Sequence, residues 1–104
     1  MGDLKYTVIV RPGAKAEIDA LRVFEQRKIT NAIRENLIHE PKSETRNKKL
    51  LKGLIPAFEH ELPVYELKVG EYRVVYDVNE EKQAVFVRAV RRKTSGMTTE
   101  EITR

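Results

Sequence analysis

The sequence contains no cysteine, which excludes disulfide bonds and cysteine-ligated zinc sites. None of its apolar runs approaches the roughly 20 residues needed to span a bilayer, so we expect no membrane association. The opening residues, Met1 to Lys5, lead into no apolar segment, and this predicts that there is no signal peptide. Together these absences favour a protein of the reducing cytoplasm.

The residues that are present describe an ordinary folded domain, which we expect to span residues 1–104. The net charge is +4, and the cations gather in two places. One cluster consists of Lys42, Arg46, Lys48, Lys49 and Lys52, and the other of Arg88, Arg91, Arg92 and Lys93. Clustered cations on a small domain indicate a phosphate-rich partner, although a solvated basic surface is the alternative.

The first half of the chain predicts one strand followed by helix. Residues 5–10 are rich in β-branched side chains and predict a strand. Residues 14–40 contain neither glycine nor proline and carry two apolar stripes at helical spacing. The stripes consist of Ala14, Ile18 and Leu21, and of Ile29, Ile33 and Leu37. We expect two helices in a hairpin, with the break near residues 24–27, because one continuous helix would be longer than the core of so small a domain.

The second half predicts a three-stranded antiparallel meander. Alternating apolar residues place strands at 64–69, 72–78 and 84–91. Gly70-Glu71 suits a two-residue hairpin turn with glycine first, and residues 79–82 form a polar connection. Residues 42–63 are ambiguous: the first half resembles a loop, and the leucines after it form either a short helix or a cover for the core. The whole order predicts an α+β fold with helices packed on one sheet face.

The expected hairpin registers place Lys68 opposite Arg73 and Arg73 opposite Arg88. Because side chains alternate between the two faces of a sheet, one face would pack against the core and the other would be open to solvent. The core face would carry Tyr65, Leu67, Val69, Tyr72, Val74, Tyr76, Val78, Val85, Val87 and Ala89, and the open face Glu66, Lys68, Arg73, Val75, Asp77, Phe86, Arg88 and Val90. Like charges opposite one another destabilise a sheet by roughly 0.2–1 kcal/mol per pair, so the row suggests a ligand with several phosphates. Alternatively, Glu66 and Asp77 neutralise the row, and a slipped register would remove it.

The sheet sequences resemble those of RelE/ParE toxins from type II toxin–antitoxin systems. The resemblance is carried by Tyr65-Glu-Leu-Lys-Val-Gly-Glu-Tyr-Arg-Val-Val-Tyr-Asp-Val78 and by Ala84-Val-Phe-Val-Arg-Ala-Val90. Glu44-Thr-Arg-Asn-Lys-Lys-Leu50 is typical of one RelE-like branch. The order of strand, two helices and meander also matches. The resemblance implies a toxin silenced by a partner antitoxin, without a cofactor.

In the RelE-like branch, basic residues on the open sheet face hold mRNA at the scissile phosphate. By this resemblance Arg73 is the family arginine and Lys68 a family lysine, while a second family lysine falls at Glu66. The basic residue after the last strand falls at Arg92 or Lys93. The terminal tyrosine or histidine of well-studied members has no counterpart in this sequence, which favours the related ParE-like inhibitors of DNA gyrase.

We therefore expect a metal-independent mRNA endoribonuclease that acts on the ribosome, with a gyrase inhibitor or a decayed antitoxin-binding homologue as alternatives. The expected catalytic residues are Arg73, Lys68, Glu66 and Lys93, and the expected RNA-binding residues are Arg88, Arg91, Arg92, Arg46, Lys48, Lys49 and Lys52. Arg73 would stabilise charge on the phosphorane because its planar fork matches phosphate oxygens. Glu66 is either the general base or a salt-bridge partner.

For the remaining polar and aromatic candidates, a structural role is the alternative to a functional one. His39 is expected to cap a helix end, where positive charge is favourable. His60 is a candidate general acid only if its loop approaches the open face. The two histidines are far apart in the sequence, which argues against a metal site. Tyr65, Tyr72 and Tyr76 fall on the core face and are expected to pack rather than stack on bases.

Overall fold

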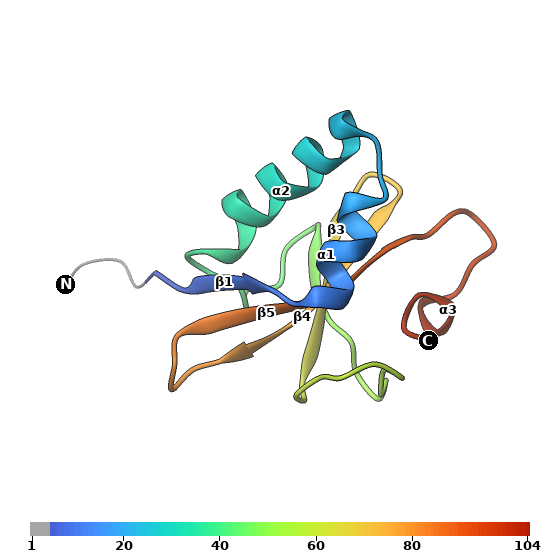
Figure 1. The fold of residues 1–104 in the computed structure, drawn as a ribbon. Helices are drawn as coiled ribbons and strands as arrows, with labels where there is room; N and C mark the ends of the chain where they lie inside the picture. The colour runs from blue at the N-terminus through green and yellow to red at the C-terminus, as the bar shows by residue number, and fades with distance from the viewer. Residues whose placement is uncertain (1–4) are drawn as a thin grey trace.

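Two helices cover one face of a twisted five-stranded sheet (Figure 1). The computed structural model describes residues 5–104, so the expectation of no signal peptide, which concerns the first residues, lies partly outside the described residues. The elements are β1 (Thr7–Val10), α1 (Pro12–Asp19), α2 (Val23–Leu37), β2 (Lys48–Leu50), β3 (Val64–Val69), β4 (Tyr72–Asn79), β5 (Ala84–Arg92) and α3 (Thr99–Ile102). The predicted α+β class is confirmed.

The sheet is mixed and has the strand order β1-β5-β4-β3-β2. The predicted meander forms its antiparallel centre, while β1 pairs in parallel with β5. The parallel pairing is possible because α1 and α2 lie between β1 and the rest of the sheet in the sequence, and a parallel pair needs a long crossover. Within residues 5–104, no helix has the length and apolar character required to cross a membrane.

The two predicted helices are present, but the predicted position of the break is wrong. The chain leaves α1 after Asp19 and enters α2 at Val23. The amide of Gln26 donates to the carbonyl of Leu21 at 2.8 Å and to that of Asp19 at 3.3 Å. A side chain thus satisfies carbonyls left open where α1 ends. Hydrophobic spacing cannot show this, because it runs nearly in phase through both helices.

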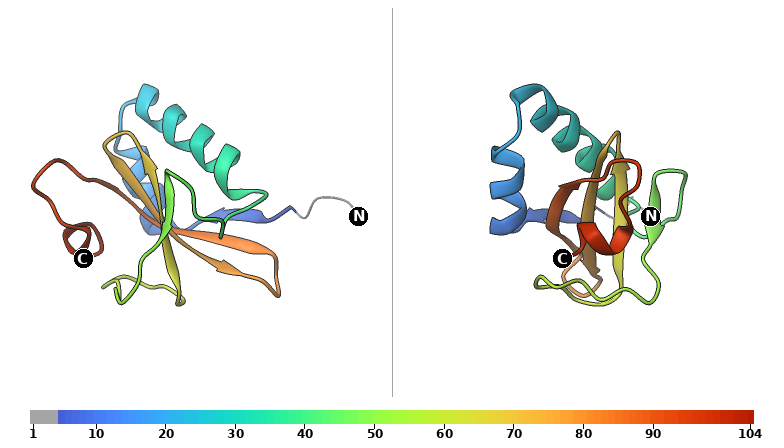
Figure 2. Two further views of the ribbon diagram at one scale, coloured as in Figure 1. Left: turned by 180° about the vertical axis from the view of Figure 1, so that it is seen from behind. Right: turned by 90° about the vertical axis from the view of Figure 1, so that its right-hand side faces the viewer.

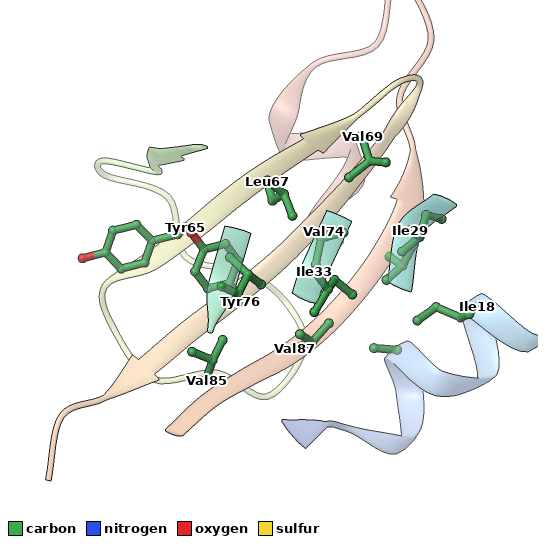
Figure 3. Packing of buried hydrophobic residues seen from close by; sticks show 13 residues of the cluster. Ile18, Ile29, Ile33, Tyr65, Leu67, Val69, Val74, Tyr76, Val85 and Val87 are labelled. Carbon is green, nitrogen blue, oxygen red and sulfur yellow. The ribbon is translucent and has the colours of Figure 1, made fainter. Parts of the chain in front are cut away.

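The core lies between the helices and the sheet (Figure 3). Ile18 from α1 and Ile29 and Ile33 from α2 point toward the sheet residues Val74 and Val87. The apolar seam of both helices is therefore buried inside the domain. The exposed apolar residues of the helices are instead Val23 and Phe24, where α2 begins, and Phe24 is 74% exposed.

The register of β3 with β4 is as predicted, with Lys68 opposite Arg73 and Val69 opposite Tyr72. Gly70 has a φ of +59°, the left-handed conformation that a glycine-first hairpin turn requires.

The predicted register of β4 with β5 is wrong. The connecting turn lies at residues 80–83, one residue later than expected, so that Val78 pairs with Val85. A β-bulge then follows: Tyr76 pairs with Val87, but Val75 pairs with Ala89. The extra residue is Arg88. A bulge reverses the alternation of side chains beyond it. Ala89 consequently joins Val75 on the open face, while Val90 joins the main core, the opposite of what was predicted.

The ambiguous segment and the C-terminal tail contain short elements that the sequence did not predict. β2 pairs with the edge of β3, so Lys48 and Lys49 belong to the sheet. Leu51 begins a second small core on the opposite sheet face, together with Val64, Val75 and Ala89. The tail folds back beside this face (Figure 2). Its helix α3 begins with a capping box, and the amide of Ala57 donates to the carbonyl of Thr103 at 2.8 Å.

Candidate nucleic-acid interface

A basic groove of about 270 Å³ lies on the sheet face opposite the helices. Its lining comes from the segment before β2, from β2 to β4 and from the residue after β5. The lining residues are Thr45, Arg46, Asn47, Lys48, Lys49, Glu66, Lys68, Arg73 and Lys93. The fold therefore brings all four predicted catalytic residues together, and it adds cations from the loop cluster. The sheet unites segments that are far apart in the sequence (Figure 2).

Arg73 is held at the groove by its own hairpin. One terminal nitrogen of its guanidinium, Nη1, donates to the carbonyls of Gly70 and Tyr72, each at 2.9 Å. Its Nε lies 3.8 Å from Oε1 of Glu66. The side chain is only 12% exposed, so the guanidinium is partly desolvated beside Lys68 on the neighbouring strand. Charges in such surroundings act on a bound phosphate more strongly than they would in open water.

Glu66 lies at the floor of the groove and is only 4% exposed. Its Oε1 has no hydrogen-bond partner among residues 5–104. The nearest cationic groups are Nζ of Lys49, 3.6 Å from Oε2, and Nε of Arg73, 3.8 Å from Oε1. Both distances are too long for hydrogen bonds. A buried carboxylate normally has its acceptors filled, so Glu66 retains the capacity to accept a hydrogen bond or a proton from a bound molecule.

Arg88 does not belong to the cation row. The bulge turns it toward Asp77, and the two side chains form a bidentate pair, Nε to Oδ2 at 2.7 Å and Nη2 to Oδ1 at 3.2 Å. Oδ2 also accepts the backbone N–H of Glu61 at 3.1 Å. Arg88 is 8% exposed and lies over the ring of Phe86. Asp77 therefore neutralises Arg88, as the alternative interpretation predicts, and an RNA contact by Arg88 stays a prediction.

By register, Arg91 takes the place opposite Arg73 that was expected for Arg88. Its guanidinium turns away from the groove, however. It pairs with Glu17 of α1 and donates to the carbonyls of Ile102 at 3.1 Å and of Arg104 at 2.6 Å. Arg91 thus connects α1 and the C-terminal turn to the sheet, and an RNA contact by Arg91 stays a prediction.

The two basic residues that follow remain accessible. Arg92 is exposed and pairs with Glu71, with Nη2 at 2.8 Å from Oε2. The backbone N–H of Lys93 donates to the carbonyl of Glu71 at 2.6 Å, and its side chain lines the groove. The end of β5 is in this way fixed to the β3–β4 hairpin, with Lys93 beside the Lys68–Arg73 pair.

The predicted loop cluster divides into buried and open members. Lys48 is buried, and its Nζ donates to the carbonyls of Asn36 at 3.0 Å and of Glu40 at 2.6 Å, where α2 ends. Burial lowers the pKa of this ammonium group below its ordinary value. Its ammonium is thus directed to the end of α2, and its docking role stays a prediction. Lys49 is open in the groove, and Lys52 is exposed beside it, in a second hollow of about 470 Å³ that reaches Thr98 and Glu100.

The histidines and tyrosines contribute nothing to the groove lining. Nδ1 of His60 lies 2.8 Å from the carbonyl of Phe58, within its own loop. Tyr65 and Tyr76 stack in the core at 5.5 Å between ring centroids, and Tyr72 donates to Glu25 of α2. Their predicted packing role is confirmed. Within residues 5–104, no three acidic or histidine side chains gather as a set that could hold a metal ion.

A mixed sheet of this order, with two helices on one face and a basic groove on the other, defines a toxin domain of the RelE/ParE class. The chain belongs to the family described as ParE toxin of type II toxin–antitoxin system, parDE, whose model matches residues 8–95. No curated protein matches the sequence significantly.

Several solved toxins share this fold. The isolated E. coli RelE toxin is 26% identical, with a TM-score of 0.64, and the match covers 92% of this chain and 93% of that one. The RelE chain of the intact E. coli RelBE toxin–antitoxin complex is also 26% identical, with a TM-score of 0.64 and coverage of 86% and 98%. The archaeal RelE–RelB complex from Pyrococcus horikoshii OT3 gives 20% identity and a TM-score of 0.69, with coverage of 88% and 99%. The chain is thus a type II toxin with a RelE-like fold.

Proposed function

We propose that this toxin is a metal-independent endoribonuclease that cuts mRNA on the ribosome and so stops translation in the cytoplasm. The observation that carries the proposal is the basic groove, in which Lys68, Arg73 and Lys93 surround a buried carboxylate with an unfilled oxygen. Cations for a phosphate and an acceptor for a hydroxyl proton are the groups that RNA cleavage requires.

The groove residues can be assigned to a balanced reaction. The ribose 2′-oxygen forms a bond to phosphorus while the bond from phosphorus to the 5′-oxygen breaks. The 2′-hydroxyl proton passes to Oε1 of Glu66, and the ammonium of Lys93 supplies a proton to the leaving 5′-oxygen. Arg73 and Lys68 stabilise the negative charge that develops on the phosphorane oxygens. The products are a 2′,3′-cyclic phosphate and a 5′-hydroxyl end.

The exposed cations around the groove are proposed to dock the toxin on RNA. Arg46 and Lys52 have exposed side chains at the margins of the site, and Arg92 is exposed where β5 ends. Long-range attraction to phosphates needs charge but little geometry, so these residues would set affinity and its salt dependence without taking part in the chemistry.

A cognate antitoxin is the proposed protein partner. The E. coli and P. horikoshii relatives were both solved as RelE–RelB complexes. A chain of net charge +4 suits an acidic segment that folds on binding. Co-purification with the product of the neighbouring reading frame checks this, and a monomer that ignores that product while remaining toxic would count against it.

Inhibition of DNA gyrase is the second candidate, because the matching family is that of ParE toxins and the tail offers no terminal tyrosine or histidine. Induced expression separates the two functions. The nuclease stops incorporation of labelled amino acids first, whereas a gyrase poison first produces DNA breaks and an SOS response. Unaffected growth would instead indicate a decayed homologue that only binds antitoxin.

A further inference from the structure

The short strand β2 places one lysine against the unfilled carboxylate. β2 pairs antiparallel with β3, and Lys49 lies directly opposite Glu66. Side chains opposite one another in such a pair extend from the same sheet face, with Cβ atoms about 4.5–5.5 Å apart. In agreement, Nζ of Lys49 lies 3.6 Å from Oε2 of Glu66.

Alternation along β2 gives adjacent lysines different surroundings. Lys48 points to the helix side, where its ammonium donates hydrogen bonds to two carbonyls at the end of α2. Lys49 points to the groove, is 59% exposed and approaches the buried Glu66 without a hydrogen bond. Its ammonium is thus attracted to the carboxylate of Glu66, and among residues 5–104 it donates to no acceptor, so it can donate to a ligand.

The two oxygens of Glu66 face different groups. Oε2 is the oxygen nearest Lys49, while Oε1 is the unfilled oxygen on the side of Arg73. A phosphate placed between Lys49 and Arg73 would meet a cation on each side. The carboxylate beneath would attract both cations and leave Oε1 free to accept a proton.

We infer that Lys49 is a catalytic residue, whose ammonium contacts a non-bridging oxygen of the scissile phosphate opposite Arg73 and is attracted to that place by Oε2 of Glu66, the proposed general base. The role differs from the docking role that the sequence suggested, because Lys49 lies inside the groove and not at its margin. The inference rests on the proposed nuclease function. It adds a cation from β2 that interacts most strongly as negative charge builds up on the phosphorane, and Lys49 transfers no proton.

The experiment is single-turnover cleavage of ribosome-bound mRNA over a range of ribosome concentrations, with ribosome affinity measured separately. Lys49→Met keeps the length of the side chain and removes its charge. We expect the maximal cleavage rate to fall about 100-fold, as when one preorganised donor is lost, with ribosome affinity changed less than about twofold. Lys49→Arg should recover part of the rate. Lys15→Met, on an exposed lysine of α1, is the control expected to match wild type.

A rate that returns to the wild-type value at saturating ribosome concentration would overturn the inference, because Lys49 would then serve docking alone. An unchanged rate at every concentration would overturn it as well. Lys49→Gln is the second variant should Lys49→Met fail to fold, as judged by a thermal melt. Failure of the proposed function is distinguishable: in that case the wild-type protein itself leaves the message intact, and the inference falls with it.

Discussion

Two carboxylates lie on the groove side of the sheet, and their surroundings differ. Asp77 is 1% exposed and Glu66 is 4% exposed, and each has an arginine beside it. Asp77 accepts two hydrogen bonds from Arg88 and one from a backbone N–H of the preceding loop. Glu66 has cations at 3.6 and 3.8 Å and an oxygen with no partner in the described chain. Asp77 is therefore a carboxylate that stabilises the fold, whereas Glu66 presents to the groove an oxygen that can still accept a hydrogen bond.

The same contrast applies to the cations. Arg88, Arg91 and Lys48 were all expected to bind RNA, but each donates to acceptors inside the protein. Arg73 also donates to two hairpin carbonyls, but from Nη1 alone, and among residues 5–104 its Nε and Nη2 and the Nζ of Lys49 donate to no acceptor. Both side chains line the groove near Glu66. Residue type and charge clustering do not distinguish the two groups, whereas hydrogen-bond saturation does. If this distinction holds, residues whose hydrogen bonds are satisfied within the protein should affect stability, and residues with unsatisfied groups in the groove should affect activity.

The largest effect on activity is expected at Arg73. Arg73→Ala should lower cleavage roughly 10²–10³-fold, because it removes a preorganised donor from the phosphate site. The melting temperature should stay close to wild type, since relief of repulsion from Lys68 offsets two lost hydrogen bonds to hairpin carbonyls. Arg73→Lys should recover only part of the activity, because a point charge cannot replace a bidentate fork.

The matched control is Arg27→Ala, since Arg27 is exposed on α2, on the other side of the sheet. Full cleavage activity in Arg73→Ala would remove the arginine from the mechanism. A loss of activity that follows a loss of folding would make Arg73 structural and abolish the contrast with Arg88.

The largest effect on stability is expected at Asp77. Asp77→Ala leaves the guanidinium of Arg88 buried without its partner, and breaking a buried pair costs about 3–5 kcal/mol. Urea denaturation of the variant should show that decrease in the free energy of unfolding. The molecules that remain folded should still cleave RNA, since Asp77 lies outside the groove lining. A decrease under about 1 kcal/mol would show that saturation does not mark a structural carboxylate.

An intermediate effect is expected from the adjacent lysines of β2. Lys48→Met should lower the free energy of unfolding by about 1–3 kcal/mol, because two carbonyls at the end of α2 lose their donor. Lys49→Met should change it by no more than about 0.5 kcal/mol, as expected for an exposed side chain. Equal effects in parallel urea titrations would refute the distinction between these two neighbours.

The smallest effect on stability is expected at Glu66. Glu66→Gln removes a charge but breaks no hydrogen bond, so the free energy of unfolding should change by less than about 1 kcal/mol. Cleavage should nevertheless fall, because an amide oxygen cannot take the hydroxyl proton. A variant that is strongly destabilised yet fully active per folded molecule would assign Glu66 to the fold, together with Asp77.

Much of the fold could be predicted from the sequence because local signals agreed with the final packing. Alternation of apolar residues gave the three central strands, and the glycine-first turn gave the pairing of Lys68 with Arg73. Those two residues and Glu66 could therefore be placed on one open face from sequence alone.

The rest depended on contacts between distant residues. The bulge at Arg88 could not be predicted from the alternation of apolar and polar residues in β5. It is stabilised by a contact with Asp77 on the neighbouring strand, and it reverses the alternation of side chains beyond it. β2 is three residues long and forms by pairing with β3, so neither its existence nor the different surroundings of Lys48 and Lys49 could be read from composition. The family resemblance did suggest that four residues lie together, namely Glu66, Lys68, Arg73 and Lys93. Although the register of β5 differs from the predicted one, Lys93 still lines the groove.

The central claim is that the groove around Glu66 and Arg73 cuts message on the ribosome. The most direct measurement adds purified toxin to a reconstituted translation reaction and maps the ends of the mRNA. We predict new 5′-hydroxyl ends within the message, present only when ribosomes are engaged and absent when Arg73→Ala replaces wild type. Intact message in the presence of wild-type toxin, with gyrase-dependent DNA breaks in a parallel reaction, would contradict the claim and establish the ParE-like function in its place.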